Sequence, residues 1–156
     1  MRHEFAKLLL SEMEVNDKIF LLTGDLGYGL FDEIKTKFPN RFLNVGSSEQ
    51  LMIGIAIGLY YESFIPICYS ITPFLLYRPF ELLRTYVNHE NIPIKLVGGG
   101  RDKDYLTLGF SHWAEDDVKI LKNLENIIIY KEESIDKDLF NKFIYSNTPN
   151  YMNLRR

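Results

Sequence analysis

The chain contains a single cysteine, Cys68, among its 156 residues. One cysteine cannot form a disulfide within the chain, so a disulfide-stabilised secreted scaffold is excluded, and a reducing, cytoplasmic location is expected. Cys68 stands inside a continuous apolar run, and we interpret it as a packed core residue rather than a nucleophile.

Long apolar runs and basic clusters are also scarce. The longest apolar stretches, residues 51–61 and 64–69, are too short or too broken to span a bilayer. The first residues carry Glu4 and Lys7 in an amphipathic pattern, unlike a secretory signal. The formal net charge is −3, and no predicted helix has a basic stripe. We therefore expect neither a membrane nor a nucleic acid as a partner.

Two further kinds of site are missing. The glycine-rich turn at Asp25-Leu26-Gly27 is not followed by Gly-Lys-Ser/Thr, so binding of a nucleoside triphosphate is not indicated. We interpret His3 and His89 as structural residues, and no cluster of ligand residues with metal-binding spacing occurs in the sequence. No metal site is expected within this chain.

What the sequence does contain is a regular alternation of apolar runs and amphipathic segments. Strands are predicted at 18–23, 41–45, 64–69, 93–97, 126–130 and 150–155, and helices at 2–15, 31–38, 48–61, 73–87, 115–124 and 135–146. Because the strand segments are continuously apolar, they are typical of a sheet that is covered on both faces. The sequence thus predicts an α/β fold with an open parallel sheet and helices on both faces, formed by residues 1–156 as one domain.

In such sheets, ligands bind beyond the carboxyl ends of the strands. The residues that follow predicted strands at these ends are Asp25, Glu49, Phe74, Arg101 and His112. We take them as the candidates for a functional site.

Glu49 is the most informative of these residues, because an uncharged stretch, residues 51–61, follows it. Burial against such a helix disfavours the charged form of a carboxyl group, which is then suited to hold a proton or to share one with a ligand nitrogen. The residue alone allows another interpretation, in which Glu49 is a first-turn acid and Ser47 and Gln50 form a capping box.

Several short motifs stand in collinear order and together cover nearly the whole chain. They are Gly24-Asp25-Leu26-Gly27, residues 38–46, Ser48-Glu49-Gln50, residues 54–59, residues 69–81, residues 109–117 and residues 149–155. This ordered set resembles the pyrimidine-binding domain of transketolase and of deoxyxylulose-phosphate synthase, which are thiamine diphosphate enzymes. The resemblance implies the thiamin diphosphate-binding fold and this cofactor.

The resemblance also implies cofactor contacts. A family glutamate, here Glu49, hydrogen-bonds N1′ of the aminopyrimidine and thereby promotes removal of the proton from C2 of the thiazolium. Phe74 corresponds to the aromatic residue that stacks on this ring, and Tyr77 extends the platform; an ordinary core aromatic is the alternative for Phe74. Asp25 corresponds to an aspartate near the cofactor, with an Asx-type turn as the alternative.

Substrate contacts follow from the same resemblance. His112 corresponds to a catalytic histidine that contacts the substrate hydroxyl or the developing alkoxide, and a helix-start residue is its alternative. Arg78 and Arg101 correspond to arginines that bind a sugar phosphate. Their alternative is a solvated charge or an ion pair with Glu81 or Asp102.

The motif of the family's other cofactor domain, Gly-Asp-Gly followed by an Asn, does not occur in the chain. That domain holds Mg²⁺ and the diphosphate of the cofactor. The resemblance therefore implies a split enzyme, in which this chain pairs with a separately encoded diphosphate-binding subunit in a heterodimer or heterotetramer. Gly54 and Gly58, at helical spacing, would permit close packing on a partner, although simple tolerance of small residues is the alternative.

The expected function is transketolase-like transfer of a two-carbon ketol unit to or from a sugar or sugar phosphate. Two alternatives stay open. The first is a subunit of a thiamine diphosphate-dependent 2-oxo acid decarboxylase or acyl-transfer enzyme, and the second is a non-catalytic partner subunit. The donor and acceptor are not determined by the sequence.

Overall fold

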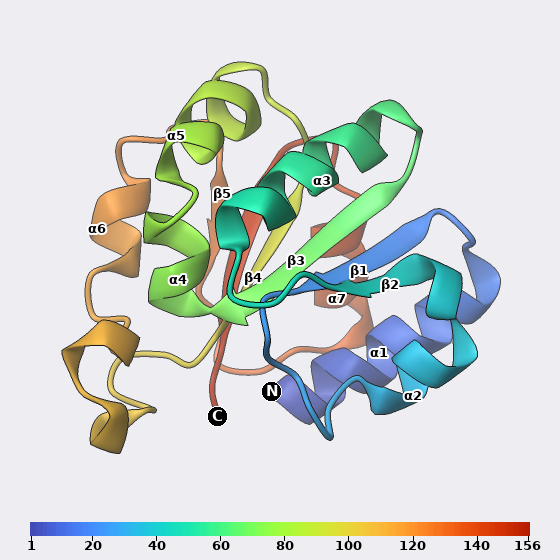
Figure 1. Cartoon of the computed structure of the whole chain (residues 1–156), viewed down its shortest axis with the longest axis horizontal. Helices are drawn as coiled ribbons and strands as arrows, with labels where there is room; N and C mark the ends of the chain where they lie inside the picture. The colour runs from blue at the N-terminus through green and yellow to red at the C-terminus, as the bar shows by residue number, and fades with distance from the viewer.

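The computed structural model describes residues 1–156, which form a six-stranded sheet in which every neighbouring pair of strands is parallel (Figure 1). The strands lie in the order β2-β1-β3-β4-β6-β5. Their bounds are β1 (Ile19–Thr23), β2 (Phe42–Asn44), β3 (Ile65–Ile71), β4 (Lys95–Gly99), β5 (Ile128–Tyr130) and β6 (Asn150–Leu154). The predicted open parallel sheet is confirmed.

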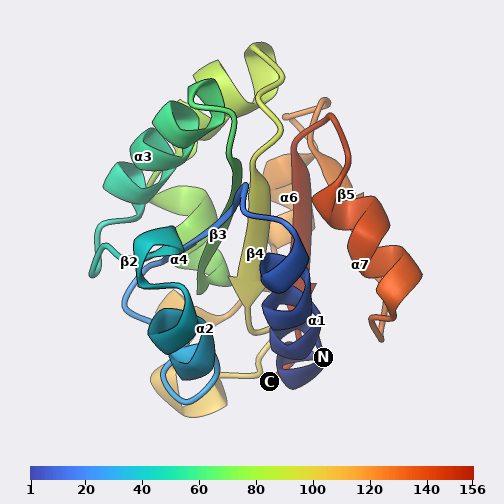
Figure 2. The same ribbon diagram turned by 90° about the vertical axis from the view of Figure 1, so that its right-hand side faces the viewer.

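Helices cover both faces of this sheet (Figure 2). The α-helices are α1 (Arg2–Val15), α2 (Asp32–Lys37), α3 (Glu49–Tyr61), α4 (Thr72–Tyr77), α5 (Phe80–Leu82), α6 (Asp117–Leu121) and α7 (Lys137–Ile144). A π-helical segment, η2 (Leu83–His89), follows α5, and the 3₁₀ turns are η1 (Pro39–Arg41), η3 (Leu106–Leu108) and η4 (Phe110–His112). No helix is both long enough and apolar enough to cross a membrane.

Two apolar clusters, one on each face, hold the layers together. Phe5 of α1 and Phe140 of α7 pack edge to face on one side, with ring centroids 5.6 Å apart. Met52 and Ile53 of α3 are fully buried on the other side. Burying a side chain of this size contributes roughly 1.5–3 kcal/mol. Because helices cover both faces of the sheet, most strand residues on either face are apolar.

The single helix predicted over residues 73–87 is wrong. The helix stops at Tyr77, a new one begins at Phe80, and a π-helical segment follows. Pro79 stands at the break, because its ring clashes with the preceding turn and its nitrogen cannot donate a hydrogen bond. Arg78 is thereby placed between α4 and α5.

The strand predicted over 93–97 is also displaced, since β4 extends through Gly98 and Gly99, which resemble a turn in the sequence. A Cβ on Gly98 would lie 2.4 Å from Oγ1 of Thr72, and one on Gly99 would lie 3.0 Å from the hydroxyl of Tyr69. These glycines are needed because α4 and β3 pack directly against them.

Lys95 opens β4 at the amino end of the sheet and is buried. Its Nζ donates hydrogen bonds to the main-chain carbonyls of Ser146, at 2.6 Å, and Thr148, at 3.2 Å. Burial lowers the pKa of Lys95 from 10.5 to about 7, because the charged form loses its hydration. Lys95 is therefore a source of pH-dependent stability.

Replacing Lys95 by methionine is expected to change how stability depends on pH. Above pH 7 the folded chain has lost this proton while the unfolded chain keeps it up to its ordinary pKa, so the wild-type free energy of unfolding rises with pH. Between pH 7 and pH 9, wild type should gain roughly 2 kcal/mol relative to Lys95→Met, as measured by urea denaturation. The exposed Lys119, changed to methionine, is the control and should follow wild type. Parallel pH profiles for wild type and Lys95→Met would contradict the prediction.

Candidate functional site

The candidate site lies where the strand order reverses at the carboxyl edge of the sheet. β1 has β2 on one side and β3 on the other, so the connections diverge there, as at the ligand crevices of other open α/β sheets. Gly24 follows β1, Ser70 lies near the end of β3, and Glu49 begins α3. These three residues come into contact at the crevice.

Glu49 is buried, and each of its carboxylate oxygens has a side-chain partner. Oε1 accepts a hydrogen bond from Oγ of Ser70 at 2.7 Å, and Oε2 pairs with Nη1 of Arg78 at 2.5 Å. Glu49 also occupies the first turn of α3, where the helix dipole favours negative charge. The alternative capping box is not formed, because no side chain caps this helix.

Gly24 provides the space for this arrangement. A Cβ at Gly24 would lie 2.9 Å from Oε1 of Glu49 and 2.8 Å from Oγ of Ser70. Contacts this short are not tolerated, so any side chain at residue 24 would push the carboxylate out of place.

Phe74 and His112 extend the site beyond the acid. The guanidinium carbon of Arg78 lies 3.9 Å from the ring centroid of Phe74, which is a close cation–π contact. The rings of Phe74 and His112 meet edge to face at 4.9 Å, and Nδ1 of His112 lies 3.0 Å from Oγ of Ser111. Glu49, Arg78, Phe74 and His112 thus form one continuous chain of contacts.

Tyr77 lies one helical turn after Phe74. Its hydroxyl donates to Oδ2 of Asp116 at 2.5 Å, and this bond raises the pKa of Tyr77 to about 12. A pocket of about 350 Å³ opens beside these rings. It is lined by Pro73, Phe74, Tyr77, Arg78, Phe110, Ser111, Trp113 and Asp116.

Asp25 is adjacent to Gly24 in sequence but has a local partner. Its carboxylate accepts a hydrogen bond from the hydroxyl of Tyr28, and its backbone has a left-handed φ of 51°. The amide of Asp25 donates to Oδ1 of Asn44 at 3.0 Å. The structure therefore places the residue at the edge of the site, in a turn.

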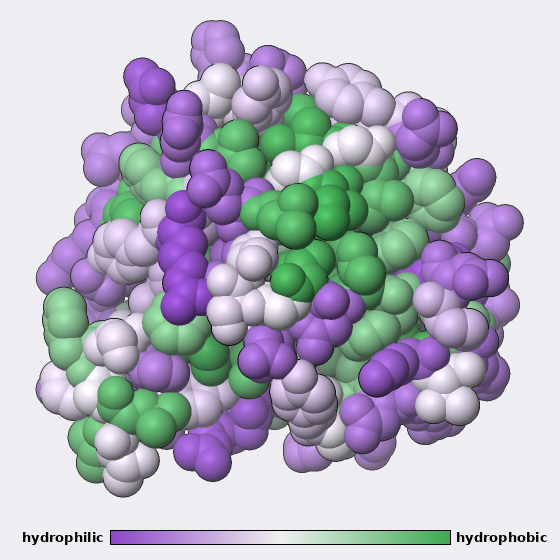
Figure 3. Space-filling model, in the orientation of Figure 1, coloured by the Kyte–Doolittle hydropathy of each residue, from purple (hydrophilic) through white to green (hydrophobic).

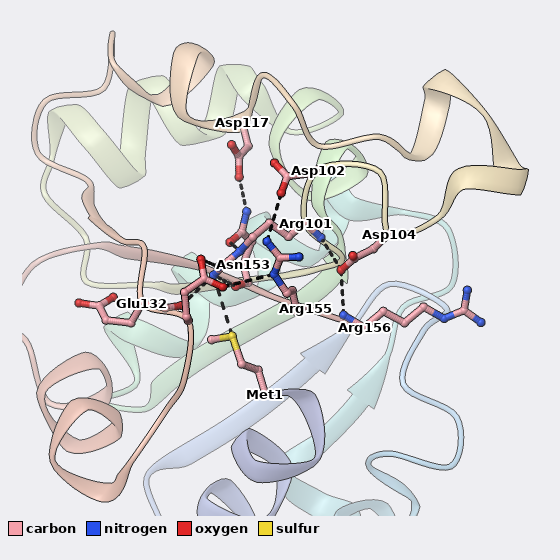
Figure 4. A network of polar contacts seen from close by, with 10 residues as sticks. Met1, Arg101, Asp102, Asp104, Asp117, Glu132, Asn153, Arg155 and Arg156 are labelled. Atoms are coloured by element: carbon pink, nitrogen blue, oxygen red, sulfur yellow. Dashed lines mark hydrogen bonds and ion pairs between the residues drawn. The ribbon is translucent and has the colours of Figure 1, made fainter.

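Arg101 lies apart from the other candidates, in the network drawn in Figure 4. Its Nε donates to Oδ1 of Asn153 at 2.8 Å, and Nη1 pairs with Glu133 at 2.8 Å. Nη2 donates to the carbonyls of Glu132 and Asn153. Every nitrogen of this buried guanidinium has a protein acceptor, so Arg101 here joins β4, β6 and the segment before α7.

Three contributors are not among the sequence candidates: Gly24, Ser70 and Asp116. Ser70 escapes prediction because the strand is expected to end one residue earlier, whereas β3 runs to Ile71. Gly24 could be found from its position directly after β1, where a glycine permits close approach. For Asp116 the sequence carries no such signal.

The residues present fit an aminopyrimidine ring. Arg78 contacts both the buried carboxyl group of Glu49 and the aromatic face of Phe74. These two groups can supply a hydrogen-bond partner for a ring nitrogen and a flat stacking surface. No group of three or more His, Cys, Asp or Glu side chains is arranged to hold a metal ion.

Residues 1–131 match the family model described as the transketolase pyrimidine binding domain. The chain therefore belongs to this family. One relative is 6-deoxy-6-sulfo-D-fructose transketolase subunit SqwH of Clostridium sp. (strain MSTE9), which is 27% identical to this chain. The match covers the full length of this chain and 49% of the length of that relative. The chain shares 32% identity with an apulose-4-phosphate transketolase subunit of Actinobacillus succinogenes, over 63% of this chain and 32% of that protein.

A solved structure is similar over 99% of the chain, with a TM-score of 0.82 and 25% identity. It is described as a split-gene transketolase in an inactive β4 tetramer, and the match covers 50% of that chain. This chain thus spans about half, or less, of the length of the relatives that it matches.

Proposed function

We propose that this chain is the pyrimidine-binding subunit of a split, thiamine diphosphate-dependent transketolase-like enzyme, folded as one domain and acting in the cytoplasm. The observation that carries the proposal is the buried carboxyl group of Glu49, which shares the partner Arg78 with the aromatic ring of Phe74. When bound, thiamine diphosphate supplies a nucleophilic carbon for attack on a ketose carbonyl.

The chain's own residues have separate tasks in this proposal. Glu49 holds a proton at the ring nitrogen, and Ser70 fixes the orientation of its carboxyl group through the 2.7 Å hydrogen bond. Phe74 stacks on the ring, and Tyr77, braced by Asp116, extends the wall of the pocket. His112, whose ring contacts that of Phe74, exchanges a proton with a substrate hydroxyl in this proposal.

We propose an anionic sugar derivative as the substrate. Two relatives are named for a sulfonated and a phosphorylated sugar, and both are called transketolase subunits. Their names favour ketol transfer over 2-oxo acid chemistry and over a non-catalytic role. An arginine fork suits either anion, and Arg78, half exposed at the pocket, is better disposed for this contact than the enclosed Arg101.

The diphosphate and Mg²⁺ are assigned to the partner, a separately encoded diphosphate-binding subunit. We propose that this subunit covers the outer face of α3. Leu51 and Tyr61 on this helix are 56% and 64% exposed, and Cβ atoms added at Gly54 and Gly58 would meet nothing within 4 Å. Figure 3 shows apolar surface gathered over this helix. Since α3 begins at Glu49, a partner on this face continues directly from the site.

Reconstitution tests the proposal. The chain mixed with its diphosphate-binding subunit, thiamine diphosphate and Mg²⁺ is expected to transfer ketol units between sugar phosphates, as measured by product formation. The purified chain alone, given the same cofactors and substrates, should be inactive because half of the cofactor's contacts are missing. Turnover by the chain alone would refute the split arrangement, and an inactive complex would refute the catalytic role.

A further inference from the structure

Arg78 makes both of the contacts that the proposed cofactor ring requires. Its Nη1 lies 2.5 Å from Oε2 of Glu49, and its guanidinium carbon lies 3.9 Å from the ring centroid of Phe74. A guanidinium is planar and carries hydrogen-bonding groups along its edge, so it stacks and bonds as an amino-substituted heteroaromatic ring does. The two groups therefore compete for one position.

Of the two charged partners, Arg78 is the one that can leave. The side chain of Glu49 is fully enclosed and is also held by Ser70, whereas the side chain of Arg78 is 41% exposed. Glu49 accepts the only hydrogen bond that the side chain of Arg78 makes. Its backbone lies at the break between α4 and α5, in front of Pro79.

Arg101 shows how an arginine that the fold encloses is held in the same chain. Its guanidinium is buried, and each of its nitrogens has an acceptor from the segments around it. Arg78 instead reaches from the surface to one buried acid and one aromatic face. This difference indicates that a ligand can replace the contacts of Arg78 with Glu49 and Phe74.

We infer that Arg78 determines which ligands enter the site, because its guanidinium occupies the position of the aminopyrimidine ring in the free subunit. The inference rests on the proposed function. A ligand is admitted only if it offers a hydrogen-bonding ring nitrogen to Glu49 and a flat face to Phe74, so that both contacts of Arg78 are replaced. The displaced guanidinium is then available for an anionic substrate.

The displacement predicts that removing the guanidinium strengthens binding of a small probe. The intrinsic fluorescence of Trp113, the chain's single tryptophan and part of the pocket wall, reports the binding of 4-amino-2-methylpyrimidine. Arg78→Met keeps the apolar stem of the side chain but has no guanidinium to block the site. It is expected to bind this probe about tenfold more tightly than wild type, because the site is open in a larger fraction of the molecules. Methylguanidinium should compete with the probe in Arg78→Met and not in wild type.

The control is Arg84→Ala, which removes an exposed arginine from η2 and should bind the probe as wild type does. If Arg78→Met fails to fold, Arg78→Lys serves instead: it keeps the charge without the planar fork and should also bind more tightly than wild type. Suppose that wild type binds the probe, that Glu49→Gln abolishes this binding, and that the Arg78 variants bind the probe no more tightly than wild type. The inference is then overturned, while the proposed function stands. If no chain binds the probe, with or without the partner subunit, both are overturned.

Discussion

Glu49→Gln is expected to lower the rate of ketol transfer by the assembled enzyme by about two to four orders of magnitude, the usual contribution of a general acid–base group. Glutamine has nearly the same shape and keeps an oxygen for Ser70, so packing at the start of α3 is retained. What is lost, in the proposed mechanism, is the proton that the carboxyl group would hold at the ring nitrogen. The rate of ketol transfer and the deuterium exchange of the cofactor's C2 proton, followed by NMR, measure the effect.

A matched substitution separates this role from a general loss of charge. Glu125→Gln changes an exposed acid that precedes β5, far along the chain from the site, and should leave both rates at the wild-type value. If Glu49→Gln exchanged the C2 proton as fast as wild type in a complex of normal composition, Glu49 would have no proton role.

The second large effect is expected at Gly54, where alanine should stabilise the free chain and arginine should abolish the complex. Gly54 lies inside α3 with open space where its side chain would be. Alanine is favoured over glycine in a helix, so Gly54→Ala should stabilise the free chain by up to about 1 kcal/mol in urea denaturation. Gly54→Arg should fold equally well and abolish the complex, because a long cation would stand between the packed surfaces.

Sedimentation of the mixed subunits measures the assembly. Ser11→Arg, at an exposed position of α1 on the other face of the sheet, is the control and should leave the complex intact. Loss of the complex in both arginine variants would show that the effect is not specific to α3. A normal complex with Gly54→Arg would place the proposed diphosphate-binding subunit elsewhere.

The layers of the fold could be predicted because they depend on local patterns. The strand segments are mainly apolar and do not alternate with polar residues, and this property indicates a sheet covered on both faces. The α4–α5 break is signalled in principle by Pro79, but apolar residues at helical spacing on both sides of it favour one long helix. Gly98 and Gly99 resemble a turn because their role depends on Thr72 and Tyr69, which lie far away in sequence.

The site could be predicted in part for the same reason. Glu49 is marked by the uncharged helix that follows it, and the structure brings it together with Arg78, Phe74 and His112. The contacts of each arginine could not be predicted, because they depend on hydrogen-bond acceptors in segments that are distant in sequence. Arg101 finds such acceptors at Glu133 and Asn153, and Arg78 finds one at Glu49.

The parallel arrangement of all six strands has a consequence for producing this chain. No neighbouring pair of strands can form as a hairpin, because two parallel strands are joined by a crossover connection of about a dozen or more residues. Chains dominated by contacts between residues far apart in sequence fold slowly, and their folding intermediates expose apolar surface that promotes aggregation. Refolding from denaturant should therefore give the best yield at low concentration, and co-expression with the other subunit should give more soluble material than expression alone.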